Sequence, residues 1–196
     1  MQLSNEEIIR LIFSLLGGGV VAGLINLWNT NRLERKRKRI EFIRSQLQEL
    51  YGPLQFFSSC NAQLFKLTDK LNEAYTDEYG NKSWSKANNT QERVRQNASQ
   101  TMDLSNEYLK QVVENNGHIL DVLTNRYSLI DPADADVFTQ FIVDHVRYKT
   151  ELSAGLKIPL EIYKHLGEIS FMRLEFVTTV DKRFKEKRAE LELLLK

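Results

Sequence analysis

The chain has 196 residues, of which 27 are basic and 26 acidic, so its formal net charge is only +1. A single cysteine, Cys60, excludes an internal disulfide and suits a reducing cytosol. The 27% of charged residues and the low count of 3 prolines are typical of a helical protein.

The first element is an apolar stretch, residues 11–28, that contains no charged side chain. At 1.5 Å per residue a helix of this length reaches about 27 Å, close to the thickness of the hydrocarbon core of a bilayer. Gly17, Gly18, Gly19 and Gly23 would each weaken a helix in water by roughly 1 kcal/mol, whereas glycine is common in membrane helices. Two acids precede Arg10 and no A-x-A site follows, which argues against a cleaved signal peptide. The stretch predicts a transmembrane anchor within residues 1–31.

Small residues recur at four-residue steps inside this stretch. This small-xxx-small spacing lets two helix backbones approach closely in lipid and predicts self-association into a homo-oligomer. A pore lined by the glycines is an alternative that the sequence leaves open. The residues expected to carry helix association are Ser14, Gly18, Gly19, Ala22 and Gly23.

A basic juxtamembrane segment, residues 32–39, follows the apolar stretch. Positive residues stay on the cytoplasmic side of a membrane, so the segment predicts an N-terminus outside and a cytoplasmic C-terminal domain at the inner (plasma) membrane. Anionic lipid headgroups would add about 1 kcal/mol per basic residue near the surface. Because the segment adjoins a span, we expect contact with membrane lipids and none with nucleic acid. Its basic residues are Arg32, Arg35, Lys36, Arg37, Lys38 and Arg39.

The remaining residues, 40–196, predict an antiparallel bundle of about four long helices. An apolar stripe runs over residues 33–75, with a kink or break expected near Tyr51 because Gly52-Pro53 interrupts the backbone hydrogen bonds. Residues 76–92 are polar and predict a loop.

Three further helices are expected in the bundle. One covers about 93–129, with a bend or a short break at Asn115-Asn116-Gly117, three poor helix formers. The next begins at Asp131-Pro132 and runs to about 152; its inward residues are taken as Val137, Phe138, Phe141, Ile142 and Val146. The last covers about 158–195 and is expected to pack antiparallel to the first.

The sequence contains no motif for nucleophilic catalysis, phosphate binding or dinucleotide binding, so we expect no enzyme and no cofactor. Glu161, His165 and Glu168 share one helix face and are the only candidate for a metal site, but a solvated, salt-bridged face is the ordinary interpretation of such a group.

A second cluster mixes cationic and aromatic residues and is a candidate site for an anion such as a nucleotide phosphate. It consists of His145, Arg147, Tyr148 and Lys149.

Short motifs in this chain resemble those of certain bacterial helical-bundle proteins. They are the segment Leu50-Tyr51-Gly52-Pro53-Leu54, the region around Asn116 and His118, and HVRYK at residues 145–149. Some proteins of that kind also carry an N-terminal span. The resemblance implies a bacterial inner-membrane protein and brings no activity with it.

The sequence thus predicts an all-α, single-pass membrane protein. It is expected to act as an interaction, scaffold or sensing module. We expect it to associate with copies of itself and to bind a further protein that the sequence does not identify. The alternative is a membrane-perturbing or pore-forming effector, triggered by a small anionic ligand on the cytosolic bundle.

Overall fold

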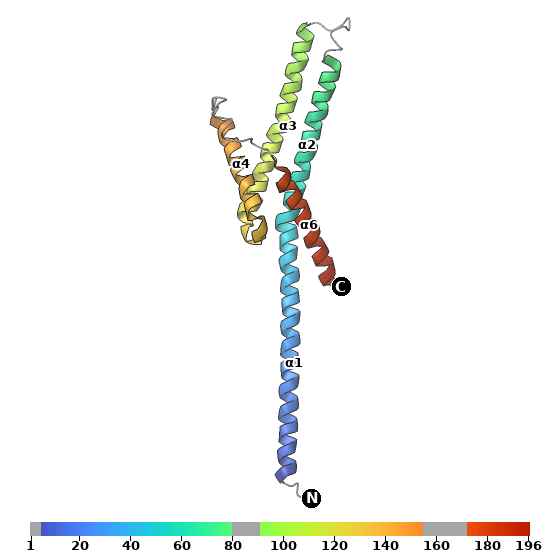
Figure 1. The fold of residues 1–196 in the computed structure, drawn as a ribbon, viewed down its shortest axis with the longest axis vertical. Helices are drawn as coiled ribbons and strands as arrows, with labels where there is room; N and C mark the ends of the chain where they lie inside the picture. Colours follow the sequence, from blue (N-terminus) through green and yellow to red (C-terminus); the bar gives the residue numbers. More distant parts are fainter. Residues whose placement is uncertain (1–4, 80–90, 155–171) are drawn as a thin grey trace. The chain divides into compact units, whose positions relative to one another are not determined.

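The computed structural model describes residues 5–79, 91–154 and 172–196. For residues 5, 8, 11, 15–19 and 151–154 it describes the backbone alone. Every element in these ranges is helical, which confirms the prediction of an all-α chain with about four long helices (Figure 1). The α-helices of the described ranges are α1 (Asn5–Ser45), α2 (Gly52–Tyr79), α3 (Gln91–Asn125), α4 (Ala135–Ala154) and α6 (Leu174–Leu195). Three short elements join them: η1 (Gln46–Tyr51), η2 (Tyr127–Leu129) and η3 (Pro132–Asp134).

The chain divides into two compact units. Unit 1 comprises residues 1–44 together with 190–196, and unit 2 comprises residues 45–189. The division therefore lies at the end of α1, a few residues after the boundary at residue 40 that the sequence suggests for the bundle.

Unit 1 consists mainly of α1, a helix of 41 residues. It runs without interruption from the apolar stretch through the basic segment (Figure 1). Across the described residues, no helix combines the length and the apolar character needed to cross a membrane.

A π-helical turn, η1, joins α1 to α2. Pro53 has no backbone N–H, and the chain responds with a wider turn in which the N–H of Gly52 donates to the carbonyl of Leu47. The interruption predicted near Tyr51 is therefore confirmed in position. It takes the form of a π turn, and the chain remains helical through Gly52-Pro53.

The core of unit 2 lies where η1, α2, α3, α4 and α6 meet. Nine apolar side chains there are at most 3% exposed, and each such burial contributes roughly 1.5–3 kcal/mol. They are Leu50, Tyr51, Leu54, Ile119, Leu123, Phe138, Phe141, Phe176 and Val180. Within this unit Gln55 donates to Asp181 and Gly52 lies beside Phe184, so α2 and α6 run antiparallel.

Three buried asparagines join α2 to α3. Asn61 Nδ2 donates to Asn116 Oδ1 at 2.8 Å, and Asn115 Nδ2 donates to Asn61 Oδ1 at 2.8 Å. Helix α3 is continuous through Asn115-Asn116-Gly117, so the short break that the sequence allowed there is wrong, and the bend stays a prediction. The amides are bonded across the helix pair, so they no longer compete with the helical backbone.

The start of the third predicted helix is confirmed. The Asp131 carboxylate accepts a hydrogen bond from the N–H of Ala133 at 3.2 Å, and Pro132 begins the short turn that leads into α4. Val146, however, is 49% exposed, so its inward placement is wrong.

Two other predicted boundaries change. Helix α2 extends to Tyr79, within the predicted loop, and α3 begins at Gln91; residues 80–90 lie outside the described ranges. Met172 and Arg173 precede α6 and are not helical, so a single helix over 158–195 is wrong at this point. At this junction the Arg173 side chain pairs with Asp144 of α4.

Candidate functional site

The basic segment of α1 presents all of its charged side chains to the surroundings of unit 1. Residues 32–39 are exposed at every position. Because α1 is continuous, these charges follow directly on the exposed apolar side chains of residues 20–28. A steep change from apolar to cationic surface along one helix is the main surface feature of unit 1.

An aromatic side chain marks this change. The Arg32 guanidinium carbon lies 5.6 Å from the ring centroid of Trp28, which is a cation–π distance. Trp28, Asn31, Arg32 and Arg35 line a hollow of about 210 Å³ on one face of α1. Their spacing of i, i+3, i+4 and i+7 is the reason they share that face.

The end of α6 contacts the same helix. Arg39 donates through Nη2 at 2.6 Å and through Nε at 2.8 Å to Glu190 Oε1. Leu195 lines a second hollow of unit 1 together with Leu33 and Ile40. The ion pair is half exposed and contributes at most about 1 kcal/mol to the free energy of unfolding. It nevertheless neutralises the charge of Arg39.

The small residues predicted to carry helix association are only partly described. Ser14, Ala22 and Gly23 are exposed on α1, whereas the side-chain positions of Gly18 and Gly19 lie outside the described part. A Cβ atom built on Gly23 would meet nothing within 4 Å. Helix association through these residues stays a prediction.

His145 of the predicted anion cluster is buried, at 5% exposure. Its ring stacks on Phe141 with centroids 6.3 Å apart, and its Nδ1 has no hydrogen-bond partner among the described residues. Burial, and secondarily the charge of Lys149, lower the pKa of His145 below its ordinary value of 6.5. The imidazole is therefore neutral at physiological pH, and it adds no positive charge to the half-buried Arg147 and the exposed Lys149.

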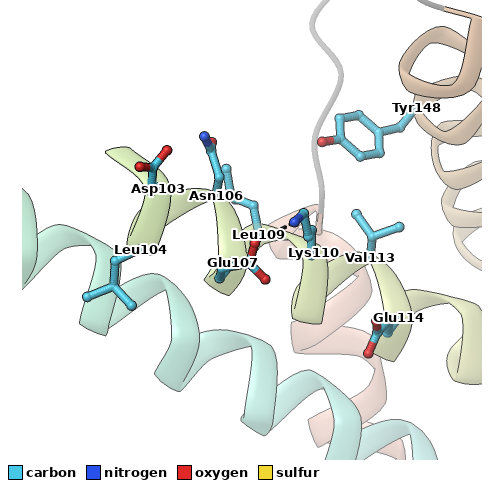
Figure 2. A pocket seen from close by; sticks show the side chains of 9 residues that line it. All are labelled: Asp103, Leu104, Asn106, Glu107, Leu109, Lys110, Val113, Glu114 and Tyr148. Carbon is cyan, nitrogen blue, oxygen red and sulfur yellow. Dashed lines mark hydrogen bonds and ion pairs between the residues drawn. The ribbon is translucent and has the colours of Figure 1, made fainter. Parts of the chain in front are cut away.

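A groove of about 800 Å³ lies between α3 and α4 in unit 2, and Tyr148 points into it from α4 (Figure 2). Lys110 is paired with Glu107, so the carboxylates of Asp103 and Glu114 set the local charge. An acidic lining disfavours an anionic ligand in this groove. The described lining is Asp103, Leu104, Asn106, Glu107, Leu109, Lys110, Val113, Glu114 and Tyr148.

A buried ion pair that sequence reasoning missed connects η3 to α6. Arg183 Nε lies 2.8 Å from Asp134 Oδ2, Arg183 Nη2 lies 2.9 Å from Asp134 Oδ1, and the Tyr51 hydroxyl donates to Asp134 Oδ2 at 3.1 Å. Burial, followed by the charge of Asp134, raises the pKa of Tyr51. The same carboxylate raises the pKa of Arg183. The Asp134 carboxylate thus joins η1, η3 and α6 through its contacts with Tyr51 and Arg183.

A second buried acid, Asp144, is held in the same way. It accepts hydrogen bonds from Gln140 and Arg173.

The candidate metal ligands lie outside the described residues; they are Glu161, His165 and Glu168. Within the described ranges, no three histidine, cysteine or carboxylate side chains are grouped to hold a metal ion.

Comparisons of the chain with protein families, curated proteins and solved structures gave no match. The segment Leu50–Leu54, which carries the resemblance noted from the sequence, lies in the π turn and the core of unit 2. These residues serve the fold of unit 2.

Protonation of His145 is expected to reduce stability at low pH. Its pKa is lowered in the folded chain, so the unfolded chain binds a proton first as the pH falls through 6.5. The free energy of unfolding should therefore decrease below about pH 6.5 and be highest above it. Urea unfolding at several pH values, followed by circular dichroism, should show this dependence reduced in His145→Gln. His118→Gln, at an exposed position, should retain it.

Proposed function

We propose that this chain is a single-pass, membrane-anchored helical interaction module of a bacterial inner membrane, and that it is not an enzyme. One observation carries the proposal: a continuous helix, α1, exposes the large apolar side chains described at residues 9, 12, 13 and within 20–28, and then a dense basic segment. In water such a surface would be unfavourable, whereas a bilayer would cover the apolar part and solvate the charged part.

The apolar side chains of α1 point in several directions around the helix. Val20 and Val21 are adjacent, so they lie about 100° apart, and both are more than half exposed. A helix that is hydrophobic on several sides is typical of a lipid environment, because a protein core would cover only one stripe. Other exposed members of this surface are Ile12, Phe13, Leu24, Ile25, Leu27 and Trp28.

The charge distribution supports one orientation. Arg10 is the only basic residue before the apolar stretch, and Glu6 and Glu7 precede it. Six basic residues follow within positions 32–39. The positive-inside rule then puts the N-terminus outside and unit 2 in the cytoplasm.

Charged substitutions in the apolar stretch test the anchor. We expect the full chain to sediment with membranes and to resist alkaline carbonate extraction. Val20→Lys with Val21→Lys should release it, because lysine near the centre of a span costs about 2.5–3.5 kcal/mol per residue. The matched control is Phe56→Lys, at a side chain of α2 that is 62% exposed, which should remain in the pellet. Extraction of the unmodified chain by carbonate would refute the anchor.

Self-association through the small residues is tested separately. Gly23→Leu adds bulk where the single chain offers open space, so the substitution costs nothing within the protomer. We expect light scattering of the full chain in detergent to give a defined oligomer, and Gly23→Leu to give a smaller species. Val21→Leu, at an exposed position outside the small-residue spacing, should keep the oligomer. A monomer for the unmodified chain would contradict this part of the proposal and point to a different protein as partner.

A further inference from the structure

We infer that Trp28, Asn31, Arg32 and Arg35 of α1 form a binding face for the phosphate of an anionic phospholipid headgroup. We call this set the headgroup face. The inference rests on the proposed membrane anchor and goes further, because it assigns a lipid class and a particular side of the helix.

The first step is the geometry of the face. The four side chains line one hollow of about 210 Å³, and the Arg32 guanidinium lies over the Trp28 ring. An indole at the edge of the hydrocarbon region is anchored at the depth of the lipid headgroups. Stacking on the indole holds one guanidinium at the same depth, and Arg35 lies about one turn further from the apolar stretch.

The second step is charge. Among the described residues, neither Arg32 nor Arg35 has an acidic partner. Arg39 lies on the same side of α1 at i+4 from Arg35, but Glu190 already neutralises it. The face therefore carries two unneutralised guanidinium groups, and a guanidinium binds phosphate oxygens through a fork of N–H donors. Asn31, which lines the same hollow, adds an amide donor to the face.

The third step is the choice of ligand. The face begins where the apolar side chains end, so its occupant must bring an anion to the boundary of the hydrocarbon region. A phospholipid with net negative charge does this, whereas a zwitterionic lipid carries a cation that opposes the two arginines. An excess of anionic over zwitterionic lipid is therefore expected around Trp28.

The experiment uses the tryptophan of the face as its own probe. The chain has two tryptophans, so Trp84→Phe leaves Trp28 as the sole indole emitter. The full chain with this change is reconstituted in nanodiscs of mixed phosphatidylglycerol and phosphatidylcholine, with bromine atoms on the acyl chains of one lipid at a time. Quenching of Trp28 by each brominated lipid gives their relative affinity at the face.

We expect phosphatidylglycerol to be preferred. Arg32→Gln with Arg35→Gln should lower the relative affinity by at least about five-fold, the effect of one basic residue near a membrane surface. The matched control, Arg37→Gln with Arg44→Gln, removes the same charge from the opposite side of α1, where both residues line the second hollow, and should keep most of the preference.

Three other results would overturn the inference, and they differ from one another. Equal losses in both double variants would show attraction by total charge without a face. Quenching by both lipids with no preference would leave the anchor intact and reject the headgroup face. No quenching of Trp28 by either brominated lipid would reject the membrane anchor itself.

Discussion

Asp134→Ala is expected to lower the free energy of unfolding by about 3 kcal/mol, since it leaves the partly buried Arg183 guanidinium without its main partner. Asp134 is 4% exposed and Arg183 21% exposed, so water restores only part of the lost interaction. The substitution also removes the acceptor of the Tyr51 hydroxyl. Urea unfolding of the full chain in mild detergent, followed by circular dichroism at 222 nm, the usual helical wavelength, measures the change.

A matched control uses a second acid, Glu186, on the same guanidinium. Glu186 lies 3.0 Å from Arg183 Nη1, but it is 45% exposed. An exposed pair contributes about 0–1 kcal/mol, so Glu186→Gln should change stability by no more than that. Similar losses for Asp134→Ala and Glu186→Gln would show that burial does not govern the strength of this network.

Gly52→Ala should also be strongly destabilising, because the π turn leaves no room for a Cβ atom. A Cβ built on Gly52 would lie 2.5 Å from the backbone oxygen of Leu47, and a backbone atom cannot rotate away. Overpacking of this kind costs about 1–3 kcal/mol, and we expect the upper end, measured by the same urea unfolding. The turn would have to shift Leu50 and Tyr51, both fully buried in the core.

Gly117→Ala provides the opposite case within another helix. A Cβ built on Gly117 in α3 meets nothing within 4 Å, so alanine should stabilise the chain by up to about 1 kcal/mol through helix propensity. The two substitutions are chemically identical, and their signs should differ. A loss of stability at Gly117, or a gain at Gly52, would contradict the packing described for these helices.

Much of the fold follows from local patterns in the sequence. The capping signal Asp131-Pro132 and the proline after Gly52 each act on the nearest turn, so the start of α4 and the interruption at residues 46–51 were predictable. The contacts of Arg183 with Asp134 were not, because they join residues 49 positions apart. No local pattern reports which of several charged residues will meet across a bundle.

Two errors arose from weighing residue type above helical phase. His145 lies at i+7 from Phe138 and i+4 from Phe141, at the centre of the buried face, while Val146 lies beyond its edge. Asn115 and Asn116 likewise lie on the face set by Val112 and Ile119. In both helices the hydrophobic periodicity places these polar residues on the buried face. A buried imidazole or amide pair, however, needs partners that only the folded chain supplies.

The candidate site divides in the same way. The position and charge of the basic segment are plain in the sequence, and the structure leaves it exposed on α1. The pairing of Arg39 with Glu190 was not predictable, because it joins residues 151 positions apart. The placement of Arg32 over Trp28 depends on side-chain geometry, which the sequence does not show.

The last seven residues have a consequence for the design of reporters. They belong to unit 1, where Glu190 contacts Arg39 and Leu195 lies in a hollow with Leu33 and Ile40. A fluorescent protein fused to Lys196 would therefore emerge beside the basic segment and crowd it unless a long flexible linker intervened. With that linker, the fluorescent protein would lie within reach of the surface that binds α1. Energy transfer to labelled lipids would then measure the distance between Lys196 and a membrane.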